Sequence, residues 1–349
     1  MAARSSISQS TRALLGGDGL RDLGEYRLKD LAAPERIYQV GEDDFPPLKS
    51  LHRMNLPIAA WPLVGRTTEL AALEELIRGR TRLVTITGPG GTGKTRLALQ
   101  AAAELLEDFR DGVFWVPLAH LRDASLLPSA IAQSLGLAQE GGATSSAVGE
   151  YLRGREVLLV IDNAEHLREL AHVLARLLSD LHDSCVLVTS RSPLHLAVER
   201  EYALDPLEIA DAVELFATQA RNVRRDFEVD DSVEMICRRL DGLPLAIELA
   251  AARAKTISAS AILDRLERRL PLLTGGPRDN PQRQQTLRAT IDWSYELLDR
   301  REQKLFREFS VFAGGADIAT AGAVCDAELD HLESLVDKSL LKPSPTLAS

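Results

Sequence analysis

The feature that most constrains this chain is the eight-residue segment Gly88–Thr95, with the sequence GPGGTGKT, which lies between a predicted strand and a predicted helix. Its spacing matches the pattern G-x-x-x-x-G-K-[ST] of a phosphate-binding loop. Glycines let successive backbone N–H groups turn toward phosphate oxygens, and the following helix presents its positive end to the same anion. We therefore expect a nucleotide phosphate to bind here. The residues expected to surround it are Gly88, Gly90, Gly91, Thr92 and Gly93.

Two side chains at the end of this loop and one further along the chain have the chemistry of a nucleotide–magnesium site. We expect Lys94 to reach the β and γ phosphates and Thr95 to bind Mg²⁺ through its hydroxyl. Asp162 ends the apolar run at 157–161 and is the candidate for a second Mg²⁺ ligand. An aspartate after a strand is often only a helix cap. The phosphate-binding loop upstream favours the metal ligand.

Asn163 follows Asp162 at the place where a general base would assist hydrolysis. An amide cannot take a proton from water, although it can orient a water molecule. Hydrolysis is therefore expected to be slow unless Glu165 or His166 supplies the missing function, and His166 is equally consistent with a surface or capping residue. Arg191 closes the next predicted strand, and a parallel sheet would place it at the same edge, where it would sense the γ-phosphate rather than remain a solvated charge.

The order of the predicted elements indicates an α/β fold. Short apolar runs alternate with helical periodicities, which predicts a parallel sheet covered by helices on both faces. The expected strands are 82–87, 112–118, 156–162, 185–190 and 201–207, with a helix over 94–106. We expect the α/β domain to span 63–206 and an all-α module to span 207–272, followed by a linker at 273–284 and a last, mainly helical module at 285–349 that ends in a strand-like turn.

Residues 1–40 end in a strand-like segment at 37–40, and the proline-punctuated stretch 41–62 is predicted to be a linker.

The 349 residues carry 41 Lys and Arg against 51 Asp and Glu, a net charge of −10, which disfavours general attraction to nucleic acid or anionic lipid. The three cysteines have no metal-ligand spacing and fit a reducing compartment. No apolar run is long enough to span a membrane. We expect a soluble, cytoplasmic protein.

These residues resemble the NB-ARC (apoptotic-ATPase-like) branch of the STAND signalling P-loop NTPases. The resemblance covers residues 63–341 and rests on the loop together with LVGR at 63–66, LVIDNAEH at 159–166, TSR at 189–191 and DGLPLAIELAA at 241–251. It implies that Val64, Gly65 and Arg66 line the adenine pocket and that Arg96 lies beside the nucleotide. It also implies that Pro244 packs on the base, although a proline at a helix start needs no such role.

The segments TLR at 286–288 and FSVFAG at 309–314 resemble the start of that family's winged-helix module, and we expect the module to be incomplete in this chain. From Arg283 to the end there are eight Lys and Arg but eleven Asp and Glu, which argues against a surface for duplex DNA. The resemblance implies that this module acts as a lid over the nucleotide.

The Asp-Asn pair resembles a bacterial subgroup of large regulators, in which the NTPase often lies between a cyclase-like domain and a LuxR-type helix-turn-helix. Residues 20–40 look like the last strands of a class III cyclase domain. The metal-binding aspartates of such cyclases would lie upstream of this segment, and we therefore expect no cyclase activity.

We expect an ATP/ADP-operated switch in signal transduction or transcriptional regulation, at most a slow Mg²⁺-dependent ATPase, with protein partners or self-association on activation. Three alternatives remain open: a fast turnover ATPase, a nucleotide-stabilised interaction scaffold or regulator fragment without turnover, and a transcription factor acting through residues 285–349.

Overall fold

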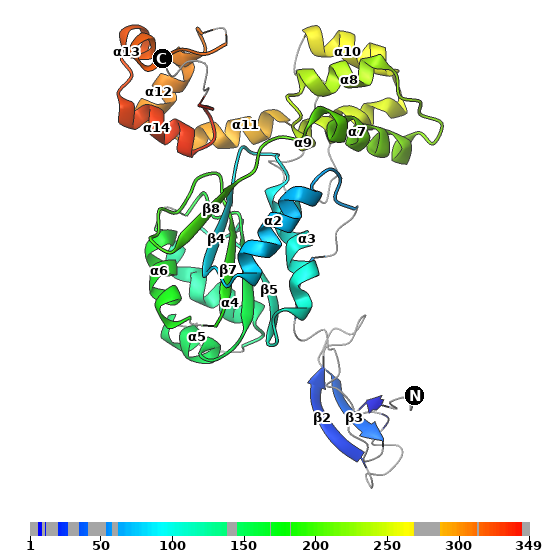
Figure 1. The fold of residues 1–349 in the computed structure, drawn as a ribbon, viewed down its shortest axis with the longest axis vertical. Coiled ribbons are helices and arrows are strands. Elements are labelled where there is room, and N and C mark those ends of the chain that lie inside the picture. Colours follow the sequence, from blue (N-terminus) through cyan, green and yellow to red (C-terminus); the bar gives the residue numbers. More distant parts are fainter. Residues whose placement is uncertain are drawn as a thin grey trace.

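The computed structural model describes residues 62–137, 145–268 and 287–343, apart from positions 168, 182 and 313. It also describes residue 11 and the short segments 6–8, 20–26, 35–40 and 54–57. Figure 1 shows the elements in these parts of the chain. No helix among them has the length and apolar character that a membrane span requires.

The N-terminal strands form a small antiparallel sheet. Strand β3 (Glu35–Val40) lies between β1 (Ser6–Ser8) and β2 (Leu20–Tyr26). The predicted strand at 37–40 is therefore present and starts two residues earlier. Tyr38 and Gln39 are buried within this sheet.

A five-stranded parallel sheet carries the phosphate-binding loop, which confirms the predicted α/β class. Its strands are β4 (Leu83–Thr87), β5 (Gly112–Pro117), β6 (Val157–Asp162), β7 (Cys185–Thr189) and β8 (Glu199–Ala203). The order is β5-β6-β7-β4-β8. The first four strands agree with the sequence prediction, whereas β8 begins before the predicted 201–207 segment. β8 is an edge strand with exposed side chains, so it lacks the continuous apolar pattern of the others.

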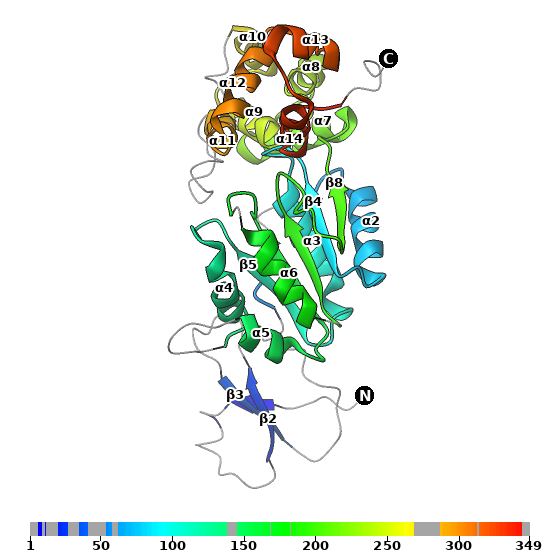
Figure 2. The same cartoon turned by 90° about the vertical axis from the view of Figure 1, so that its left-hand side faces the viewer.

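Helices cover both faces of this sheet (Figure 2). One face packs against α2 (Thr67–Arg78) and α3 (Lys94–Glu104), and the other packs against α4 (Leu127–Ser134), α5 (Ser145–Leu152) and α6 (Leu170–Asp180). The predicted helix at 94–106 is α3, whose last turn tightens into a 3₁₀ segment at Leu105–Glu107.

Part of the predicted linker at 41–62 is attached to the sheet. Met54 forms a parallel bridge with Val113 of β5. The Asn55 side chain exchanges two hydrogen bonds with the backbone of Trp115, at 2.5 and 2.8 Å. β5 lies at one edge of the sheet, where the outward-facing backbone groups of a strand can pair with another segment of the chain. Met54 and Asn55 supply that segment. The linker predicted at 273–284 lies outside the described residues.

The next helices surround a core of their own. They are α7 (Ile209–Val223), α8 (Asp231–Arg239), α9 (Pro244–Ala251), a 3₁₀ turn (Ala252–Lys255) and α10 (Ala259–Arg268). Their apolar stripes converge on fully buried side chains that include Phe216, Ile236, Ile247 and Ile262. We call residues 207–268 the helical module.

The last described elements are α11 (Leu287–Glu296), α12 (Arg300–Phe309), α13 (Ile318–Cys325) and α14 (Leu329–Asp337), here called the C-terminal module. A separate cluster around Leu305 and Leu335 forms its core. Within 287–343 every assigned element is a helix, and the segment after α14 is a turn, so this range contains no strand at the predicted strand-like ending.

Candidate nucleotide-binding site

The phosphate-binding loop connects β4, near the middle of the parallel sheet, to the first turn of α3. Thr92 is buried, and its hydroxyl donates to the Pro89 carbonyl at 2.9 Å. Gly91 has φ +89°, and a Cβ there would lie 2.9 Å from the Cβ of Leu245 in α9. Only glycine fits this position, because the loop approaches the helical module so closely.

Lys94 lies inside the loop rather than pointing to solvent. Its Nζ donates to the carbonyls of Gly88 and Pro89 at 2.6 and 2.9 Å. Burial lowers the pKa of Lys94 to about 8, and the nearby Arg191 acts in the same direction, while Glu165 and Asp162 oppose the shift. An amine already removed from water can bind a phosphate oxygen with little further desolvation.

Thr95 and Asp162 meet at the carboxyl edge of the sheet. The Thr95 hydroxyl donates to Asp162 Oδ1 at 2.8 Å, and Thr189 at the end of β7 donates to the same oxygen at 2.7 Å. The parallel order β6-β7-β4 brings all three strand ends to this edge. Mg²⁺ is bound in such sites by few protein oxygens and by substrate phosphates, so a hydroxyl beside a carboxylate fits this ion. The described residues contain no cluster of three or more His, Cys, Asp or Glu suited to a metal.

Asn163 is held in a fixed orientation after β6. Its φ is +68°, and its backbone N–H donates to the Thr189 hydroxyl at 2.9 Å. The Asn163 amide lies 3.2 Å from His166 Nδ1, and His166 Nε2 lies 2.9 Å from the Leu121 carbonyl. A carbonyl only accepts, so Nε2 donates to it, and in the neutral ring Nδ1 accepts from the Asn163 amide. His166 is therefore part of a polar network within the site and not a helix cap.

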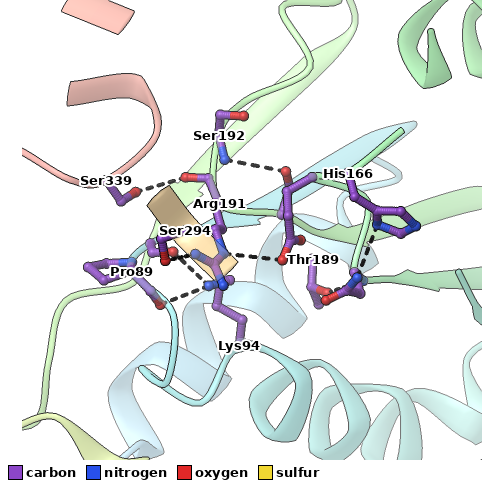
Figure 3. Close-up of polar contacts among 12 residues, drawn as sticks. Pro89, Lys94, His166, Thr189, Arg191, Ser192, Ser294 and Ser339 are labelled. Carbon is purple, nitrogen blue, oxygen red and sulfur yellow. Dashed lines mark hydrogen bonds and ion pairs between the residues drawn. The ribbon is translucent and has the colours of Figure 1, made fainter. Parts of the chain in front are cut away.

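Arg191 lies at the same edge as the loop and is buried (Figure 3). Its Nε is 3.3 Å from Glu165 Oε1, and the two side chains are only 9% and 8% exposed. The guanidinium also donates to the hydroxyl of Ser294 in α11, and the Ser339 hydroxyl donates to the Arg191 carbonyl at 2.8 Å. The alternative of a solvated surface charge is therefore wrong.

Ser294 and Ser339 were not singled out from the sequence. Each is a lone serine whose position beside Arg191 depends on how the C-terminal module docks. No local pattern signals such a contact, since the residues are 103 and 148 positions from Arg191.

The segment before α2 joins the loop to the helical module. Val64 packs against the core of that module, and Gly65 lies against Asp211 of α7. Arg66 is buried and donates to the carbonyls of Asp205 at 2.7 Å and Thr92 at 3.3 Å. Arg66 thus connects this segment with the end of β8 and with the phosphate-binding loop.

The element DGLPLA at 241–246 also touches the loop. Pro244 opens α9, and the next backbone N–H, that of Leu245, donates to the Gly91 carbonyl at 3.1 Å. Arg96, expected beside the nucleotide, pairs at 2.6 Å with Glu248 of α9, the helix that Pro244 opens. Burial raises the pKa of Glu248, and the pairing with Arg96 opposes this shift without reversing it.

Comparisons with known proteins support this picture. A family model described as an AAA domain matches residues 77–198. The putative HTH-type transcriptional regulator Rv0890c of Mycobacterium tuberculosis is 42% identical over 276 residues, which cover 75% of this chain and 31% of that protein. The regulatory protein AfsR of Streptomyces griseus is 28% identical over 97% of this chain and 36% of its own length. This chain thus matches only about a third of these regulators' lengths.

The Walker-type ATPase PABY2304 of Pyrococcus abyssi has a similar fold, with a TM-score of 0.55 and 15% identity over 79% of this chain and 89% of that one. The uncharacterized protein Rv0894 of Mycobacterium tuberculosis is 41% identical over 272 residues, which cover 75% of this chain and 68% of that protein. The chain therefore belongs to the family of Rv0894 and carries an AAA-type P-loop NTPase domain.

Proposed function

We propose that this chain is a nucleotide-operated switch of the STAND type, in the NB-ARC branch that its motifs resemble. We call the α/β domain at 63–206, which carries the phosphate-binding loop, the P-loop domain. ADP bound by the P-loop domain, the helical module and the C-terminal module would favour a closed form, and ATP with Mg²⁺ would favour an open one. One observation carries this proposal. Arg191, at the phosphate edge, is bound by Ser294 and Ser339 of the C-terminal module. A ligand that draws Arg191 away would weaken the docking of that module.

In this proposal the modules are the units predicted from the sequence, 63–206, 207–272 and 285–349, the last a winged-helix-like lid. Lys94 binds the β and γ phosphates, Thr95 and Asp162 hold Mg²⁺, and Arg191 senses the γ-phosphate. Magnesium would neutralise phosphate charge when bound. The remaining residues proposed to contact the nucleotide or attacking water are Val64, Gly65, Arg66, Gly88, Gly90, Gly91, Thr92, Gly93, Arg96, Asn163 and Pro244.

The energy for switching comes only from the difference in affinity between the two nucleotide states. A change from mostly closed to mostly open requires a differential affinity of about 5 kcal/mol. A buried guanidinium that exchanges the Ser294 hydroxyl for a phosphate is one source of such a difference, because hydrogen bonds to charged groups contribute about 1.5–3 kcal/mol.

The names of the relatives support a role in transcriptional regulation. Two of them are described as an HTH-type transcriptional regulator and as a regulatory protein. The net charge of −3 after residue 282 makes residues 285–349 a poor surface for duplex DNA. We propose that this switch acts through protein partners or self-association, with slow turnover of ATP.

The first experiment is to denature the purified protein and identify the released nucleotide by chromatography. We expect about one ADP per chain in the wild type and none in Lys94→Ala, which loses the phosphate-binding amine. Lys255→Ala, at an exposed lysine of the helical module, is the control and should keep the nucleotide. A wild-type protein that carries no nucleotide and ignores added ATP would refute the switch and favour an interaction scaffold.

A further inference from the structure

The site contains two carboxylates close to the phosphate-binding loop, and they have different surroundings. Asp162, at the end of β6, accepts hydrogen bonds from the hydroxyls of Thr95 and Thr189, as suits a metal ligand. Glu165 lies three residues further on, with its side chain 8% exposed and its Oε1 3.3 Å from Arg191 Nε. Glu165 is therefore a buried acid with no part in the proposed magnesium site.

Glu165 also lies next to the group that would sense the γ-phosphate, because its Oε1 is 3.3 Å from Arg191 Nε and both side chains are buried. Arg191, the partner of Glu165, lies beside Lys94 in Figure 3.

The other two candidates for proton transfer are engaged with each other. The Asn163 amide has no basic atom, and it donates to His166 Nδ1. The opposite ring nitrogen of His166 donates to the Leu121 carbonyl. His166 thus positions Asn163, and the lone pair of its Nδ1 is occupied by the Asn163 amide. Of the three candidates Asn163, Glu165 and His166, this leaves Glu165 to act as the base.

We propose that Glu165 is the catalytic base for ATP hydrolysis at this site, an inference that rests on the proposed function. The Glu165 carboxylate takes a proton from a water molecule as the water oxygen forms a bond to the γ-phosphorus. The bond between the γ-phosphorus and the bridging oxygen breaks, and its electron pair leaves with ADP. The ion pair with Arg191 competes for the same carboxylate while the C-terminal module holds Arg191, and this competition would make turnover slow.

The test is single-turnover hydrolysis, with full-length protein in excess over labelled ATP and Mg²⁺ present. Glu165→Gln should slow phosphate release by about a hundredfold or more, the usual contribution of a general base. Its affinity for ATP should stay within about threefold of wild type, and chromatography of the bound nucleotide should find ATP retained. Glu169→Gln, at an exposed glutamate four residues away, is the control and should behave as wild type.

A second variant separates proton transfer from the ion pair with Arg191. Glu165→Ala leaves a small buried space, and formate added to it should restore phosphate release several-fold, whereas chloride should not. If Glu165→Gln and Glu165→Ala both release phosphate slowly and formate does not restore the rate, Glu165 only holds Arg191 in place. That result would overturn the proposal.

Failure of the proposed role of Glu165 and failure of the proposed switch would give different results. Equal rates in wild type and Glu165→Gln would overturn the role of Glu165 and leave the switch intact. A wild type that binds ATP but never releases phosphate would also overturn it, while nucleotide binding would still support the switch. Only a wild type that fails to bind nucleotide would refute the proposed function.

Discussion

At the scale of single residues, the helical module depends on a glycine where its first residue meets the turn before α9. Gly242 has φ +65°, and a Cβ at this position would lie 2.2 Å from the carbonyl oxygen of Leu207. The Gly242 carbonyl in turn accepts from the Leu207 N–H at 2.9 Å. This close approach fixes the start of α9, where Pro244 lies.

Gly242→Ala is expected to destabilise the protein more than Gly154→Ala. Both glycines have a positive φ, which costs an alanine about 1–2 kcal/mol, but Gly154 has open space around its Cβ position. The clash at Gly242 should add about 1–3 kcal/mol. Urea unfolding of the two variants measures this difference directly. Equal losses would mean that backbone strain alone matters at Gly242.

At the scale of elements, α12 and α14 are joined by a buried carboxylate. Asp299 and Glu302 form a capping box at the start of α12. The Glu302 side chain, 5% exposed, also accepts from Lys338 and, at 2.6 Å, from Ser334. Burial would raise the pKa of Glu302, but these donors and the Asp299 N–H outweigh it and hold the pKa below its ordinary value.

We therefore expect Glu302→Gln to lower the melting temperature of the C-terminal module at pH 7, by the loss of about 1–3 kcal/mol from the charged hydrogen bonds. A lowered folded-state pKa contributes stability above the ordinary glutamate pKa, and this is lost as the pH falls through the folded-state value. The difference from wild type should thus shrink below about pH 4.5. Glu333→Gln, at an exposed position of α14, is the control. A difference that does not change with pH would contradict this account.

At the scale of the whole molecule, the C-terminal module is joined to the P-loop domain by a few polar contacts. Besides the bonds of Arg191, His195 lies 3.2 Å from Asp337 and Lys342 lies 2.7 Å from Asp205. These two pairs are exposed, and exposed pairs contribute little. The buried bond between Arg191 and Ser294 is therefore expected to dominate the docking.

Ser294→Ala should accelerate release of bound ADP by about tenfold or more, because it removes a hydrogen bond to a buried charge. Stopped-flow displacement of a fluorescent ADP analogue measures the rate. Ser310→Ala, at an exposed serine of the same module, should leave it unchanged. Identical rates for the two variants would mean that the C-terminal module does not retain the nucleotide.

The sequence by itself determined the α/β class, four of the five strands of the parallel sheet, and the convergence of Lys94, Thr95, Asp162 and Arg191 at one edge. These follow from local patterns, since apolar runs form buried parallel strands and parallel strands end at the same edge. The position of β8 was less predictable because an edge strand is half exposed.

Only the tertiary structure decided which side chains the site residues meet. The pairing of Glu165 with Arg191, the bonds of Arg191 to the C-terminal module, the pairing of Arg96 with Glu248 and the attachment of Asn55 to β5 join residues 26 to 152 positions apart. Such contacts depend on how the packed elements are oriented. No local periodicity encodes that orientation, because it arises from the burial of many side chains at once.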